Sequence, residues 1–197
     1  MKFIWKLALP ITACVMLSAC ITTRSYVDPQ YHVASYAQIQ HPAGQVPVRV
    51  LARFERNGQA FPAVDAGLHD LVERTLRATG VFTAPAESTG GAVVEVVANN
   101  IADIKAARSR GFSAGLTFGA SGANVPDLYD FTFIYRDAAG KQQRMSYHHA
   151  IYTSVGQASA PVSSTPTTAA LAFGQVVEDV TLNFVKALQD QGAVARH

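Results

Sequence analysis

The chain of 197 residues carries 16 lysine and arginine residues against 14 aspartate and glutamate residues, a formal net charge of +2 at pH 7. This balance excludes the strongly basic surface that nucleic-acid binding requires, and the length suits one domain of ordinary size. The 2 cysteines, Cys14 and Cys20, both precede residue 21. A pair so close to the terminus has no core to cross-link and supplies only half of a four-ligand zinc site, so the sequence favours neither a disulfide nor a metal.

Residues 1–19 have the pattern of a secretory signal peptide. Lys2 and Lys6 form a basic start, the apolar run LALPITACVML follows, and the small residues Ser18 and Ala19 end the segment. The apolar run is shorter than the roughly 20 residues that a transmembrane helix needs. Removal of this segment leaves equal numbers of basic and acidic residues in the mature chain.

The four residues Leu17-Ser18-Ala19-Cys20 resemble the lipobox of bacterial lipoproteins. The resemblance implies cleavage between Ala19 and Cys20 and acylation of Cys20, which becomes the first residue of the mature chain. In lipoproteins of this kind an aspartate directly after the acylated cysteine favours retention at the inner membrane, and here that residue is Ile21. We therefore expect a protein held on the periplasmic side of the outer membrane by the acyl chains of Cys20.

The chain after Cys20 is expected to divide into a tether, a domain and a tail. Residues 20–45 show no sustained hydrophobic period and contain Pro29, Pro42 and Gly44, which favours a lipidated, mostly extended tether. Residues 46–192 are expected to form a single periplasmic domain, and residues 193–197 a short C-terminal tail.

A strand and a helix begin the predicted domain. Apolar and polar residues alternate over 46–56, which predicts a half-buried strand that ends at Asn57-Gly58. Residues 65–79 place leucine and valine at helical spacing, and Gly80 supplies a stop signal.

Four further strands and a long helix are expected to follow. The β-branched residues of 92–104 predict a central strand. Three more segments predict an antiparallel meander, and they cover residues 112–120, 128–136 and 144–155. Thr165-Pro166 offers an N-cap with proline at the first helical position, and Gly192 ends the helix.

This element order, β-α-β-β-β-β-α, predicts an α+β fold with an antiparallel-dominated sheet of about five strands and two helices on one face. Together with the lipobox, the order resembles the small envelope lipoproteins of Gram-negative bacteria of the YajG type, with YHHAIYTSVGQ before a helix as the nearest local similarity. The resemblance implies two helices against an antiparallel sheet and transfers no catalytic or binding residue. It favours a non-enzymatic interaction or accessory module of the cell envelope, with an envelope protein as its partner.

The glycine-rich stretch GFSAGLTFGASG, residues 111–122, supports a second interpretation. Its phenylalanine, alanine and leucine residues alternate with small residues, so a strand is favoured over a helix. The glycines allow close approach of another backbone or a partner, and they are Gly111, Gly115, Gly119 and Gly122. The alternative function is a subunit of an oligomeric lipoprotein secretion pore, resembling curli-type channels, which inserts the 111–136 hairpin and its aromatic row, Tyr129 to Tyr135, in the membrane.

No residue pattern in the chain indicates catalysis, a metal site or a cofactor. Nucleophile-elbow, phosphate-loop, dinucleotide and zinc-protease motifs are all missing from the sequence. His148 and His149 are neighbours on a predicted strand, so they point to opposite faces and cannot share a metal. The spacing of Asp127 and Asp130 separates those carboxylates in the same way. The sequence therefore predicts no enzyme.

Overall fold

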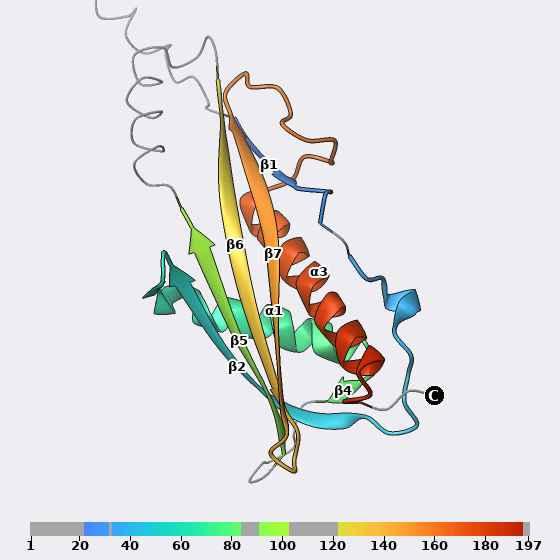
Figure 1. Cartoon of the computed structure of the whole chain (residues 1–197). Coiled ribbons are helices and arrows are strands. Elements are labelled where there is room, and N and C mark those ends of the chain that lie inside the picture. Colours follow the sequence, from blue (N-terminus) through green and yellow to red (C-terminus); the bar gives the residue numbers. More distant parts are fainter. Residues whose placement is uncertain (1–21, 32, 84–90, 103–121, 195–197) are drawn as a thin grey trace, which may run out of the picture.

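The computed structural model of the chain describes residues 22–31, 33–83, 91–102 and 122–194. These residues form a mixed α+β fold with one seven-stranded sheet and two α-helices, α1 (Asp65–Ala78) and α3 (Ala169–Asp190) (Figure 1). Two short 3₁₀ helices accompany them, η2 (Tyr36–Gln38) and η3 (Pro62–Val64). The strands are β1 (Thr23–Val27), β2 (Val46–Arg56), β3 (Gln59–Ala60), β4 (Phe82–Thr83), β5 (Ala92–Ile101), β6 (Ala123–Arg136) and β7 (Gln142–Val155). The α+β class expected from the sequence is confirmed.

The sheet is larger than predicted and mixed in strand direction. Its order is β1-β7-β6-β5-β2-β3, and β4 pairs with β2 off this path. β2 runs parallel to β5 and to β4, whereas the other pairs are antiparallel. The prediction of about five strands is wrong, because the short strands β1, β3 and β4 join the sheet. The sheet is mixed because the chain crosses over through α1 between β2 and β5, and such a crossover makes parallel neighbours. The strand predicted over 112–120 lies outside the described residues.

The first strand and the first helix end where the sequence predicts. Asn57 and Gly58 have φ angles of 52° and 75°, which suits the tight turn from β2 to β3. Gly80 follows α1 with φ of 69°, and its N–H donates to the carbonyl of Arg77 at 3.0 Å. A glycine accepts this left-handed conformation without the strain that a side chain brings, so the helix stops here.

The last helix begins three residues later than the predicted Thr165-Pro166 start. Thr168 is the N-cap, and its side chain accepts a hydrogen bond from the N–H of Leu171 at 3.3 Å. Thr167 cannot be helical because its N–H and carbonyl both bond to the backbone of Ser25 in β1 at 2.8 Å. A tertiary contact therefore overrides the local capping signal.

The hydrophobic core lies between one face of the sheet and the two helices. Phe131 and Phe133 of β6 are almost fully buried, and the ring of Phe133 stacks on that of Phe184 in α3 with centroids 4.7 Å apart. Leu68 and Val72 of α1 belong to the same core cluster. The prediction that the aromatic row of this strand meets the helices is confirmed, and the burial leaves Phe131 and Phe133 covered by the chain itself.

The segment expected to be a tether is part of the folded domain. Residues 23–27 form β1, an edge strand antiparallel to β7, and Tyr26, Val27, Ala34 and Ile39 are buried. Beyond β1 the chain passes along the outer side of α3 (Figure 1). There the side chain of Gln189 bonds both the N–H and the carbonyl of Gln40, at 3.0 and 2.6 Å. The tether prediction fails because buried contacts of this kind are made by scattered residues with no period in sequence.

Candidate functional site

The predicted site residues fall into two groups. Ala19 and Cys20, together with Gly111, Gly115 and Gly119, lie outside the described residues. Gly122 is described, and it precedes β6 with φ of 61°. A Cβ at this position would lie 2.2 Å from the backbone nitrogen of Ala158 and 2.8 Å from the carbonyl oxygen of Val155. The close approach that this glycine permits is therefore to the chain's own backbone.

The two neighbouring histidines point to opposite faces of the sheet, as predicted. His148 is exposed and pairs with Asp130 across the β6–β7 ladder. His149 is 3% exposed and faces α3. Among the described residues no group of three histidine, cysteine, aspartate or glutamate side chains converges as metal ligands would.

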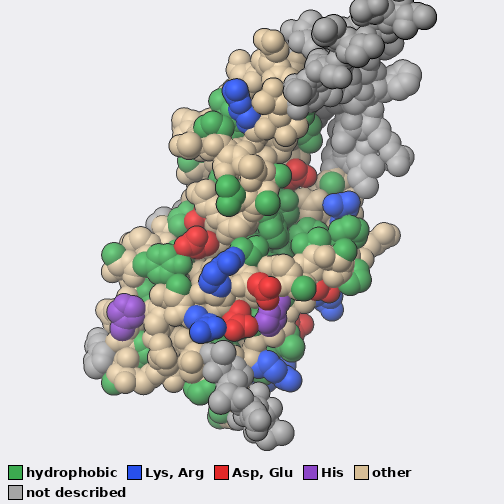
Figure 2. Space-filling model, turned by 180° about the vertical axis from the view of Figure 1, so that it is seen from behind, with side chains coloured by type: hydrophobic (Ala, Val, Ile, Leu, Met, Phe, Trp, Pro, Cys, Tyr) green, Lys and Arg blue, Asp and Glu red, His purple; other side chains and the backbone are tan. Residues whose placement is uncertain are grey.

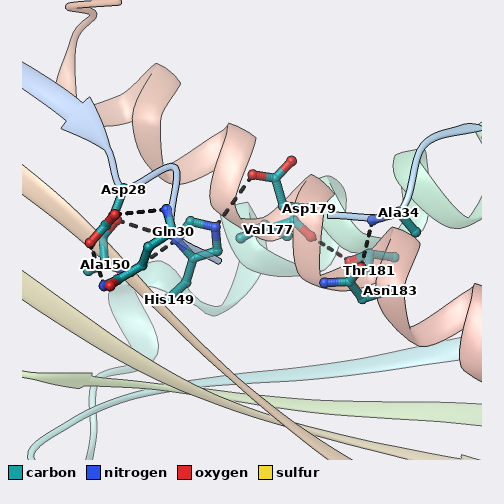
Figure 3. A network of polar contacts seen from close by, with 9 residues as sticks. All are labelled: Asp28, Gln30, Ala34, His149, Ala150, Val177, Asp179, Thr181 and Asn183. Atoms are coloured by element: carbon teal, nitrogen blue, oxygen red, sulfur yellow. Dashed lines mark hydrogen bonds and ion pairs between the residues drawn. The ribbon is translucent and has the colours of Figure 1, made fainter. Parts of the chain in front are cut away.

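His149 belongs to a buried polar network that joins β7, α3 and the segment after β1 (Figure 3). Its Nδ1 lies 3.0 Å from the backbone nitrogen of Ala150, whose N–H donates to it. Nε2 lies 3.5 Å from a carboxylate oxygen of Asp179, close enough for electrostatic attraction but too far for a strong hydrogen bond. The ring of Tyr31 covers the imidazole at 4.8 Å between centroids.

The same network fixes the N-terminal segment to the domain. Asp28 donates its N–H to the carbonyl of Ala150 at 3.1 Å, and its carboxylate accepts both the N–H and the side-chain amide of Gln30, at 3.0 and 2.7 Å. Further along, the N–H of Ala34 donates to the side chain of Asn183 at 2.7 Å.

The partners of His149 in the described structure are a carboxylate, a backbone amide and an aromatic ring, none of which is an activated nucleophile. We read the network as a structural clamp.

Sequence reasoning missed this clamp, although one signal was available. Asp179 lies on the side of α3 that is buried, next to the buried residues Val176 and Val180 of the same helix. A carboxylate at such a position needs a partner, because an unpaired buried charge is strongly unfavourable. The sequence does not say that the partner is His149.

A groove lies on the outer side of the helices. It has a volume of about 760 Å³ and is bounded by α1, α3 and the segment around η2. Three large apolar side chains line it and are exposed to solvent, Leu171 at 66%, Tyr36 at 39% and Val33 at 38%. The hydroxyl of Tyr36 donates to Glu178 at 2.7 Å, and burial, together with this bond and the Glu178 charge, raises the pKa of Tyr36 to about 12. Exposed apolar groups gathered in one groove are typical of a binding surface.

The opposite face of the sheet is open and carries charges of both signs. A depression of about 470 Å³ crosses β2, β5, β6 and β7. Its charged lining residues are Arg53, Glu55, Glu95, Asp130 and Arg144. Arg53 and Glu55 pair at 3.1 Å. Since charges of both signs stand side by side on this face, it is typical of the solvated side of a sheet.

Comparison with known proteins gives weak structural similarities only. No protein-family model matches the chain, and no curated protein matches it. Among solved structures, the PelC dodecamer from Paraburkholderia phytofirmans is similar with a TM-score of 0.35 and 13% identity, over 86% of this chain and 97% of that one. A crystal structure of an uncharacterized protein is similar with a TM-score of 0.32 and 9% identity, over 81% of this chain and 99% of that one. Both scores are too low to support an argument about function.

Proposed function

We propose that the protein is a lipid-anchored outer-membrane lipoprotein that faces the periplasm and acts as a non-enzymatic interaction module of the cell envelope. The observation that carries the proposal is the sequence Leu17-Ser18-Ala19-Cys20 after a basic and apolar start. A folded domain directly behind this motif supports it, since β1 begins at Thr23. No helix in the described part of the chain is both long and apolar enough to cross a bilayer. In this proposal, membrane attachment rests on the acyl chains of Cys20.

Replacing the cysteine tests the anchor. The Cys20→Ser chain has no thiol to acylate, so we expect no palmitate incorporation and loss of the protein from the outer-membrane fraction. Ser18→Ala, which keeps a small residue at the same distance from the cleavage site, is the matched control and should be acylated normally. Equal palmitate incorporation and membrane retention in the Cys20→Ser variant would overturn the lipoprotein proposal.

The groove between α1 and α3 is the surface that we assign to the envelope protein partner. Its apolar lining by Leu171, Tyr36 and Val33 would be covered by such a protein. A photo-reactive residue in place of Leu171 should form cross-links in native membranes, whereas the same residue in place of Leu51, which is 43% exposed on the open face, should not. Cross-links from position 51 alone would place the partner on the other side of the sheet.

The alternative function, a secretion pore, gains no support from the described half of its hairpin. Phe131 and Phe133 of β6 are 1% and 0% exposed, and the ring of Phe133 stacks on Phe184 of α3. A lipid-facing row would need these rings on the outside of the domain.

A further inference from the structure

One end of the domain is fixed close to the site of lipid attachment. Thr22, the first described residue, accepts a hydrogen bond through its carbonyl from the N–H of Gly156 at 2.9 Å. Gly156 begins the loop of residues 156–168 that connects β7 to α3 and forms the upper end of the domain in Figure 1. We call this end, made by Thr22, the start of β6 and the loop 156–168, the anchor end.

The loop is held firmly to the strands beside it. The side chain of Asn124 in β6 donates to the carbonyl of Ser159 at 3.2 Å and accepts the hydroxyl of Ser154 at 2.6 Å. Gly122 packs against the backbone of Ala158, as described above. The loop, the start of β6 and Thr22, the residue before β1, are therefore held together by hydrogen bonds and close packing.

Chain length limits how far this end can be from the bilayer. Cys20 precedes Thr22 by two residues, and two extended residues span at most roughly 7 Å. The polar headgroup layer of one leaflet is about 6 Å thick. Since an acylated Cys20 sits at the bilayer surface, a reach of this size leaves the anchor end within the headgroup layer or directly on it.

The charge of the anchor end fits this placement. In the described ranges 22–26, 122–126 and 152–168, which make up this end, Arg24 is the one residue among Lys, Arg, Asp and Glu, and Asp28 and Asp127 lie just beyond these ranges. Arg24 is exposed, and a guanidinium suits the phosphate of a lipid headgroup. On the side of the described surface seen in Figure 2, charged side chains gather in the middle and lower parts, and one Lys or Arg side chain lies among uncharged atoms in the upper part.

We infer that the anchor end is a lipid-contacting surface, on which the loop 156–168 rests on the phospholipid headgroups and the long axis of the sheet points away from the membrane. This inference rests on the proposed lipid attachment at Cys20. In this arrangement the domain begins next to the bilayer, without the extended tether that the sequence predicted over residues 20–45. The distal end of the domain is then the turn at 137–141, separated from the anchor end by the 14 residues of β7, or roughly 45 Å.

Tryptophan quenching by brominated lipids tests the orientation. The sequence holds 1 tryptophan, Trp5, in the predicted signal peptide, so a single introduced tryptophan is the sole indole of the mature chain. Ala160→Trp and Ser163→Trp place it at exposed positions of the loop, and Ala138→Trp places it at an exposed position of the distal turn as the matched control. Each full-length lipoprotein is reconstituted in phosphatidylethanolamine–phosphatidylglycerol vesicles with or without brominated phosphatidylcholine.

We expect quenching in the two loop variants to exceed that of Ala138→Trp several-fold. Weak and equal quenching at all three positions would overturn the inference, provided that mass spectrometry shows the chains to be acylated and that they float with the vesicles. The anchor end would then contact a protein or a second copy of the chain, and the proposed function would still stand. Strong and equal quenching would also overturn it, because the domain would then lie flat on the bilayer. Chains that are not acylated at Cys20 would overturn the proposed function and this inference together.

Discussion

Phe133 in β6 and Phe184 in α3 stack with their ring centroids 4.7 Å apart and their planes 27° from parallel. Both rings are fully buried. They come from segments some fifty residues apart in the sequence, so this contact fixes the C-terminal helix on the sheet and covers the aromatic row of β6.

Removing one of the two rings should be costly. Phe184→Ala leaves a cavity under α3, and we expect a loss of about 3–5 kcal/mol in the free energy of unfolding. Urea denaturation followed by circular dichroism measures it. Leu171→Ala on the same helix is the control, since Leu171 is 66% exposed and should change the stability by less than about 0.5 kcal/mol. A loss of less than about 1 kcal/mol for Phe184→Ala would show that the ring is not buried on the sheet.

A charge introduced on β6 distinguishes a covered strand from a lipid-facing one. Phe131 is 1% exposed, so Phe131→Lys buries an unpaired ammonium group and should lower the stability by about 3 kcal/mol or more. Leu128→Lys lies on the same strand, where Leu128 is 42% exposed, and should stay within about 0.5 kcal/mol of the parent. Thermal unfolding measures the change in stability of both variants. If the Phe131→Lys domain is as stable as the parent, Phe131 is not buried, and the secretion-pore function is favoured.

Two glycines should respond to alanine in opposite directions. Gly122 has φ of 61°, and a Cβ there would collide with the backbone of Ala158, so Gly122→Ala should lower the stability by about 1–3 kcal/mol. Gly67, in the first turn of α1, has no atom within 4 Å of an added Cβ. Gly67→Ala should therefore raise the stability by about 0.4–1 kcal/mol through the lower entropy of the unfolded chain. Two variants that shift the urea midpoint equally would contradict the described packing of Gly122.

The stability of the domain should fall at alkaline pH, in part through Tyr147. Burial raises the pKa of Tyr147 from 10.0 to about 12. The folded protein holds this phenolic proton more tightly than the unfolded chain does, so the contribution is complete below pH 10 and is lost as the pH rises from 10 through about 12. We expect Tyr147→Phe, which cannot ionise, to lose less stability than the parent between about pH 9 and about pH 12 in urea unfolding. Parallel pH curves for the two proteins would refute the assignment.

Several elements were predictable because their signals are local. The alternation over 46–56 matches β2 residue for residue, and the helical spacing after Asp65 matches α1 to within one residue. The side of β6 that is buried could also be predicted, since successive residues of a strand face opposite sides of a sheet. The contact between Asp179 and His149 could not be predicted, because periodicity shows that each residue faces the core but not which residue of another element it contacts.

The sequence by itself determined the candidate lipid attachment at Cys20, the type of most elements and the side of each that is buried, because these depend on residue order and on the 3.6- and 2-residue periods. Only the tertiary structure decided the parallel pairing of β2 with β5, the late start of α3 and the docking of β1 and of Gln40 on the domain. These features rest on contacts between segments far apart in the chain, such as Ser25 with Thr167 and Gln40 with Gln189. The free energy of such contacts comes from hydrogen bonds and surfaces that exist only after the chain has folded, and no local pattern records them.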